Sequence, residues 1–167
     1  MTDNIANGLE GVAKDNYGSN YTEHLFEQYK LYVEMADKIS ARRQTANTFF
    51  LTINTAVVAL LGAVLPSTDR LLSTAWYVVV GLAGLLLCFF WFQLLSSYRN
   101  LNSAKFNVVH EIERKLPIRP YVAEWSSVGK GKDAKLYLPF THIETKVPWV
   151  FAALYVALTV IALVHGV

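Results

Sequence analysis

Three long apolar stretches dominate the pattern of hydrophobic and polar positions along the chain. They cover residues 47–65, 75–95 and 147–164, and none of them contains Asp, Glu, Lys or Arg. Each is close to the roughly 20 residues that a helix needs to cross about 30 Å of hydrocarbon. A soluble helix of this length keeps a polar stripe for water, so surfaces that are apolar all round indicate lipid. The pattern predicts an all-α membrane protein with three transmembrane helices.

The helical periodicity of the first two stretches continues into the polar sequence beside them. Apolar side chains recur every three or four positions from residue 21 onward, which predicts one continuous helix of about 44 residues and roughly 66 Å. Residues 96–116 prolong the second stretch in the same way, until Pro117 stops the helix. We expect the two extensions to pack as an antiparallel cytoplasmic stalk. The side chains predicted to pack there are Tyr29, Tyr32, Ile39, Leu101, Val108 and Ile112.

A segment rich in proline, glycine and aromatic residues follows the second extension. Pro120 at a first helical position, with Gly129 as the stop, predicts a two-turn helix between them. A turn over residues 129–133 and an extended stretch over 136–140 are expected next. Thr141 and Glu144 then form a capping box that opens the last helix. The segment is predicted to be a small loop subdomain.

The distribution of basic residues predicts the orientation of the spans. Of the fifteen Lys and Arg residues, only Arg70 lies in the link between the first two spans. Because basic flanks stay on the cytoplasmic side, the N-terminus and residues 96–146 should be inside and the C-terminus periplasmic. The chain is expected in the bacterial inner membrane. The predicted anchors at the membrane interfaces are Arg42, Arg43, Trp76, Trp91 and Trp149.

These patterns together predict the organisation of the chain, segment by segment. The expected segments are a disordered cytoplasmic tail (1–20), a cytoplasmic helix (21–46), the first span (47–65), an external loop (66–74), the second span (75–95), the cytoplasmic helix and loop subdomain (96–146), the third span (147–165) and an external C-terminus (166–167). The net charge of +2 is too small to suggest a nucleic-acid partner, so none is expected.

The first span is unusually polar for a transmembrane helix. An amide exposed to lipid leaves hydrogen-bonding groups unpaired at a cost of several kcal/mol, so these side chains should meet protein or water. The favoured interpretation is interhelical hydrogen bonding that fixes the register of the helices. The alternatives are the wall of a water-filled passage or plain lipid contact. The residues predicted at this oligomer interface or pore lining are Gln44, Asn47, Thr48, Thr52, Asn54 and Thr55.

Candidate catalytic or metal-binding groups are sparse. His24, His110 and His142 could combine with Glu111, Glu113 and Glu144, yet neither HExxH nor GxSxG is present. We therefore predict no enzyme, metal or cofactor, and keep a membrane enzyme that uses His110 and Glu113 only as a distant hypothesis. The turn over residues 129–133 lacks the Walker A spacing, so a solvated loop near anionic lipid headgroups is favoured over a nucleotide site.

A set of short sequence words resembles the RipA family of small bacterial inner-membrane proteins over residues 21–165. The words are residues 29–32 (YKLY), 36–47 (ADKISARRQTAN), 102–106 (NSAKF), 110–113 (HEIE), 116–117 (LP), 120–121 (PY), 124–125 (EW), 129–133 (GKGKD) and 147–149 (VPW). The resemblance implies a homo-octamer, and its best-described member supports intracellular growth and pH adaptation of a bacterial pathogen. A weaker similarity in layout is to the two-span SLATT effectors, from which the third span departs.

Two principal hypotheses for the function follow. The first is a homo-octameric scaffold that supports envelope or stress adaptation, with itself and membrane lipids as partners. The second is an oligomeric ion channel or pore lined by the polar face of the first span. With cyclic symmetry, each subunit can turn that face toward a common axis.

Overall fold

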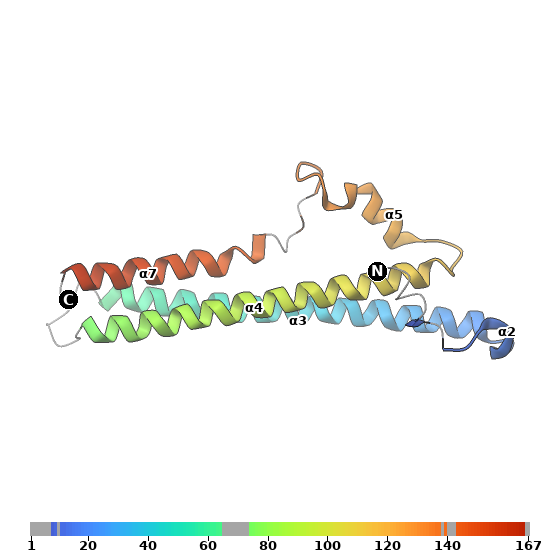
Figure 1. The fold of residues 1–167 in the computed structure, drawn as a ribbon, viewed down its shortest axis with the longest axis horizontal. Helices are drawn as coiled ribbons and strands as arrows, with labels where there is room; N and C mark the ends of the chain where they lie inside the picture. The colour runs from blue at the N-terminus through green and yellow to red at the C-terminus, as the bar shows by residue number, and fades with distance from the viewer. Residues whose placement is uncertain (1–7, 10, 65–73, 138, 140–142, 166–167) are drawn as a thin grey trace. The chain divides into compact units, whose positions relative to one another are not determined.

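The computed structural model describes residues 8–9, 11–64, 74–137, 139 and 143–165 (Figure 1). Within these ranges the chain is helical and no strand occurs, so the all-α prediction is confirmed. The elements are α2 (Lys14–Tyr17), α3 (Tyr21–Val64), α4 (Thr74–Glu113), α5 (Pro120–Ser127), the 3₁₀ turn η2 (Gly129–Gly131) and α7 (Val147–His165).

Three of these helices are long and apolar enough to cross a membrane, namely α3, α4 and α7. The 44 residues of α3 form one uninterrupted helix, as the periodicity of the sequence predicts. Only 11%, 28% and 17% of the most apolar windows of α3, α4 and α7 are buried within the single chain. Most of their surface must therefore meet lipid or other protein molecules.

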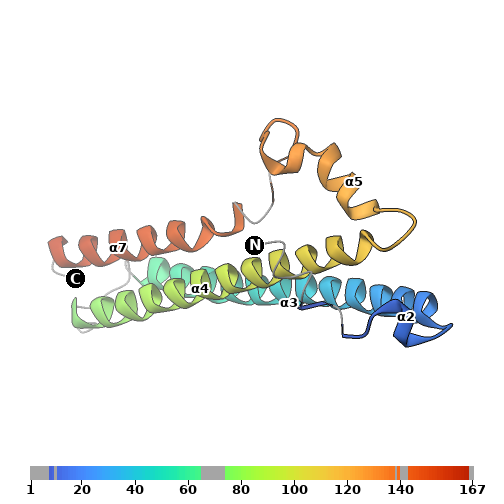
Figure 2. The same ribbon diagram turned by 45° about the vertical axis from the view of Figure 1, so that its right-hand side comes forward.

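The chain divides into two compact units, and the long helices contribute to both. The stalk unit comprises residues 1–41 and 98–139, and the membrane unit comprises residues 42–97 and 140–167. The first half of α3 and the second half of α4 therefore belong to the stalk unit, with α5 and η2. The other halves belong to the membrane unit, where α7 runs beside them (Figures 1 and 2).

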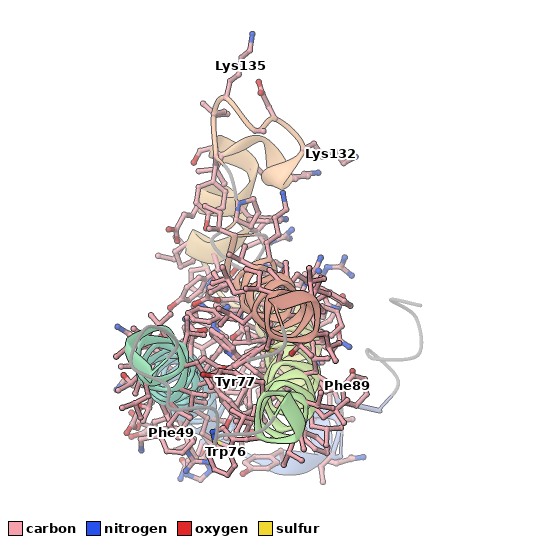
Figure 3. All side chains as sticks on the ribbon, turned by 90° about the vertical axis from the view of Figure 1, so that its left-hand side faces the viewer. Phe49, Trp76, Tyr77, Phe89, Lys132 and Lys135 are labelled. Atoms are coloured by element: carbon pink, nitrogen blue, oxygen red, sulfur yellow. The ribbon has the colours of Figure 1, made fainter. Side chains whose placement is uncertain are left out.

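The core of the membrane unit is built from side chains of all three of its helices. Its buried residues are Leu61, Tyr77, Cys88, Tyr155 and Ala162. Figure 3 shows Tyr77 directed inward, whereas the neighbouring Trp76 is 50% exposed. The same view labels Phe49 and Phe89, which are more than half exposed. Outward-facing aromatic side chains of this kind suit a lipid environment.

Two glycines of α4 allow α7 to approach closely. A Cβ atom at Gly81 would overlap the Thr159 side chain, and one at Gly84 would overlap the ring of Tyr155. Small residues are the usual means by which transmembrane helices come into close contact, because there is no water to expel between them. These two positions therefore set the spacing between α4 and α7.

The stalk unit departs from the sequence prediction at two points. Helix α4 ends at Glu113, before Pro117, because the amides of Lys115 and Leu116 form tightened bonds to the carbonyls three residues earlier. Residues 134–136 form a turn in which Leu136 and Tyr137 donate to the Asp133 carbonyl, so the extended prediction is wrong there. Leu138 and Phe140 lie outside the described residues. The predicted helix starting at Pro120 is confirmed.

Candidate functional site

Asn54 connects all three helices of the membrane unit. Its side chain is fully buried, and its Nδ2 donates to the Phe50 carbonyl at 2.8 Å. Its Oδ1 accepts from the Tyr155 hydroxyl at 3.1 Å and from the Cys88 thiol at 3.6 Å. In hydrocarbon an unpaired amide is costly, so these bonds fix the register of α3 against α4 and α7.

Asn47 makes a second bond between helices, one heptad before Asn54. Its Oδ1 accepts from the indole Nε1 of Trp91 at 3.0 Å. Trp91 is fully buried and stacks on Phe50, with the ring of Phe151 on the α7 side. Trp91, predicted as an anchor at a membrane interface, is enclosed by protein within the membrane unit. Sequence position alone does not tell which side of its helix a tryptophan occupies.

The other predicted anchors are distributed between the surface and an internal ion pair. Trp76 and Trp149 are 50% and 61% exposed, and Arg42 is exposed. Arg43 is largely covered and lies 3.4 Å from the carboxylate of Glu144, which is itself buried. This pair joins the start of the apolar part of α3 to the approach to α7. Thr141, the predicted partner of Glu144 in a capping box, lies outside the described residues.

The remaining polar side chains of the first span lie on a separate, exposed stripe of α3. This stripe consists of Gln44, Thr48, Thr52 and Thr55. The structure thus divides the predicted polar face in two. The asparagines bond to other helices of the same chain, while the stripe remains available to neighbours, water or lipid.

In the stalk unit, Glu113 is a buried polar side chain that connects different helices, as Asn54 does in the membrane unit. It is fully buried, and one carboxylate oxygen accepts from the Tyr29 hydroxyl and the Tyr121 amide, both at 3.0 Å. The other oxygen accepts from the Val122 amide at 3.2 Å. These amides are among the unpaired N–H groups of the first turn of α5, so Glu113 caps that helix from the end of α4.

Burial and nearby negative charges raise the pKa values of the two tyrosines beside Glu113. Burial, followed by the hydrogen bond to Glu113 and its charge, raises the pKa of Tyr29. Burial, followed by the charges of Asp37, Glu124 and Glu113, raises the pKa of Tyr121. Both hydroxyls are therefore held in the neutral form, which suits hydrogen-bond donation by Tyr29.

The residues predicted to pack the stalk occupy different environments. Ile112 is buried, whereas Leu101 is 48% exposed on the outside of α4. Tyr29, Tyr32, Ile39 and Val108 are half-buried. The ammonium group of Lys105 lies 4.3 Å from the ring centroid of Tyr32, a cation–π contact that compensates for its burial.

The candidate catalytic and metal-binding groups do not gather into a cluster in the part of the chain that the structure describes. Glu111 pairs with Arg114 at 3.0 Å, and the His24 ring bonds to the Tyr17 hydroxyl at 2.9 Å. His110 lies beside the ring of Phe106. His142 is outside the described residues.

The glycine turn after α5 does not form a phosphate cradle. Gly129, Lys130 and Gly131 have successive φ values of 64°, 56° and 66°, one turn of left-handed backbone. The amides of Gly131 and Lys132 donate to the carbonyls of Val128 and Gly129. These N–H groups are therefore used within the turn and do not point at a ligand.

Residues 26–164 match the octameric membrane protein family (8xMP). The chain belongs to this family. The matched range contains all of α4, α5 and η2 and most of α3 and α7, so the match extends over helices of both units. The family name describes membrane proteins that form octamers. No curated protein and no solved structure matches the chain.

Sequence reasoning missed the partners of the two buried polar groups. Tyr155 lies mid-way along an apolar helix, where its hydroxyl needs a hydrogen-bond partner. A tyrosine in the middle of an apolar stretch is therefore a signal that the sequence contains. Glu113 carried no such signal, because glutamates at the end of an exposed helix are ordinary. Its role depends on the reversal of the chain between α4 and α5.

Proposed function

We propose that the chain forms a homo-octamer in the bacterial inner membrane and acts as a structural scaffold of the envelope. The observation that carries the proposal is the internal pairing of Asn54 with Tyr155 and Cys88. With Asn47 bonded to Trp91 as well, each subunit is a self-contained three-helix unit. Family membership supports the oligomer, and the outer apolar surface of the spans supplies contacts to lipid and to neighbouring copies.

Exposed apolar side chains outside the spans also support self-association. Leu31 and Met35 on α3 are 57% and 42% exposed, and Leu101 on α4 is 48% exposed. Apolar surface of this kind on a part of the chain outside the membrane marks a protein contact. Neighbouring copies in a ring would cover it.

We place the stalk unit in the cytoplasm and the C-terminus in the periplasm. The basic residues that flank the spans support this orientation. The resemblance of short sequence words to the RipA family supports a role in stress or pH adaptation of the envelope. We propose no enzymatic step, since the carboxylate of Glu113 is occupied by three donors.

The mass of the intact assembly in lipid nanodiscs, together with conductance in planar bilayers, tests the scaffold. We expect the mass of eight chains and an insulating bilayer. A mass of one chain would contradict the oligomer. Steady single-channel currents would contradict the scaffold and support the channel.

The exposed stripe of α3 favours a channel as the second candidate function. If eight copies turn Thr48, Thr52 and Thr55 toward an axis, their hydroxyls provide a polar lining. Threonine hydroxyls also bond to the carbonyl four residues earlier in their own helix, so the stripe is compatible with lipid too. The scaffold is therefore preferred.

Substitutions on the stripe separate the two functions. A channel predicts that Thr52→Leu and Thr55→Leu abolish ion flux, while Leu60→Ala, at an exposed position about 80° around the helix from Thr52, leaves it intact. A scaffold predicts no flux in any of the three. Equal currents in the wild type and all three variants would exclude the stripe as the lining.

A further inference from the structure

The segment after α4 folds into a small compact element, here called the α5–η2 element (residues 118–137 and 139). Its centre is Trp125. A Cβ atom at Gly131 would lie 3.0 Å from the indole of Trp125 and 3.2 Å from Pro139. The Tyr137 ring meets Trp125 edge-on at a centroid distance of 6.5 Å. The chain thus returns over α5, and the left-handed turn makes this return possible because it places glycine on both sides of Lys130.

The α5–η2 element keeps a large part of its apolar surface uncovered. No residue of α5 or η2 is buried. Ile118 and Leu136 are 72% and 60% exposed, and Tyr137 and Trp125 are 42% and 40% exposed. An ordered element with aromatic and aliphatic side chains but no buried residue in its helices indicates a surface that is covered by something else.

Positive charge accompanies this apolar surface. The α5–η2 element contains four basic and two acidic residues, so it accounts for the whole formal net charge of +2 of the chain. Lys130, Lys132 and Lys135 are exposed, and Figure 3 shows Lys132 and Lys135 extending outward from the loop. Among the described residues no ion pair joins these three lysines to a carboxylate.

We propose that the α5–η2 element docks on the anionic lipid headgroups of the membrane that contains the protein. The lysines bind the phosphate groups, and Leu136 and Tyr137 enter the interface between headgroups and acyl chains. Nine residues, 138–146, lie between Tyr137 and Val147, the start of α7. This linker spans at most about 36 Å when fully extended, so the element stays within reach of the bilayer surface.

The charges of the chain favour lipid over a second copy as the partner. Glu27 and Glu34 on α3 are each paired with a lysine of the same helix, at 2.7 Å in both cases. Glu113 is buried beneath α5. These three carboxylates are thus engaged within their own chain, whereas a bilayer with anionic lipid presents a continuous surface of phosphates.

Depth measurement with a spin label on the full-length protein in nanodiscs tests the proposal. Cys88→Ala removes the native thiol, and Leu136→Cys then carries a nitroxide whose collisions with oxygen and with a water-soluble nickel complex are compared. When phosphatidylglycerol is added to phosphatidylcholine nanodiscs, we expect the label to collide less often with the nickel complex and more often with oxygen, as a label at the membrane interface does. A label at Gln28→Cys, exposed on α3, should remain aqueous in both. Ile118→Cys provides a second site should Leu136→Cys not assemble.

Charge removal with a matched control assigns the effect to the loop. Replacing the three loop lysines should abolish the shift on anionic lipid, whereas replacing three exposed lysines of α2 and α3 should preserve it. The loop variant carries Lys130→Gln, Lys132→Gln and Lys135→Gln. The control variant carries Lys14→Gln, Lys30→Gln and Lys38→Gln.

Four outcomes would overturn the proposal. Labels at Leu136→Cys and Ile118→Cys that stay aqueous in every lipid mixture would exclude docking. Spin–spin broadening that disappears on dilution with unlabelled subunits, with no dependence on lipid, would identify a second copy as the partner. The same shift on adding inorganic phosphate to phosphatidylcholine nanodiscs would identify a site for free anions. An equal loss of the shift in both triple variants would assign it to overall charge instead of the loop.

Discussion

Asn54 in the membrane unit and Glu113 in the stalk unit are both fully buried, and the two polar side chains are used differently. Asn54 is neutral and bonds mainly to side chains of other helices. Glu113 is acidic and bonds to the backbone of a helix start as well as to Tyr29. A neutral amide is the cheaper group to bury between apolar helices, whereas a carboxylate is well matched to the positive end of a helix.

The two units also differ in how their helices pack. In the membrane unit, Gly81 and Gly84 bring α7 against α4, so a continuous core includes Tyr77 and Tyr155. In the stalk unit, α5 and η2 contain no buried residue. We infer that contacts between close helices hold the membrane unit together, and that the Glu113 cap holds α5.

The largest effect is expected at the contact between α4 and α7. Gly84→Leu puts a side chain where the Tyr155 ring lies, and overpacking of this kind costs about 3 kcal/mol. We expect a lower melting temperature, and size-exclusion chromatography should show that most of the assembled protein is lost. Ala83→Leu, an exposed position one residue away, should behave as the wild type. Normal assembly of the glycine variant would show that α7 does not approach α4 here.

Glu113→Ala should release α5 without unfolding the membrane unit. The amides of Tyr121 and Val122 lose their acceptors and Tyr29 loses its partner, at a cost of about 2 kcal/mol. Hydrogen exchange should show lost protection at these two amides. Glu124→Ala, an exposed acidic residue of α5, is the matched control. Unchanged protection in Glu113→Ala would contradict the cap.

Asn54→Leu should destabilise the membrane unit by about 1 kcal/mol, because hydrogen bonds between transmembrane helices are individually weak. A double-mutant cycle with Tyr155→Phe measures the coupling by thermal unfolding in detergent. The two effects should not add, since both remove the same bond. Thr55→Leu on the exposed stripe of α3 is the control. Full additivity would mean that the bond does not form.

Alkaline pH should have the smallest effect, and it should act on the stalk unit. The pKa of Tyr29 lies above its ordinary value of 10.0, so the folded state retains a proton that the unfolded state releases. This contribution to stability is complete below pH 10 and decreases as pH rises further. Tyr29→Phe should flatten the decline, measured by circular dichroism melting across this range. Tyr137→Phe, at an exposed tyrosine, should leave the decline as in the wild type; an equal change in both variants would contradict the assignment.

The fold could be read largely from local patterns in the sequence. Three uncharged apolar stretches predicted the membrane helices, and periodicity through residues 21–64 predicted the continuous α3. Pro120 marked the start of α5. These features depend on residues close together in the chain, because span length and helix initiation are decided within a few turns.

The sequence by itself therefore determined the solvent of the helices, their number and their approximate ends. Only the tertiary structure decided which polar side chains face inward: Asn47 and Asn54 pair with other helices, while Thr52 on the same span remains exposed. It also assigned Trp91 to the interior and Glu113 to the start of α5. The physical reason is that hydrogen-bond partners up to 101 residues apart are chosen by helix rotation and packing, which hydropathy does not encode.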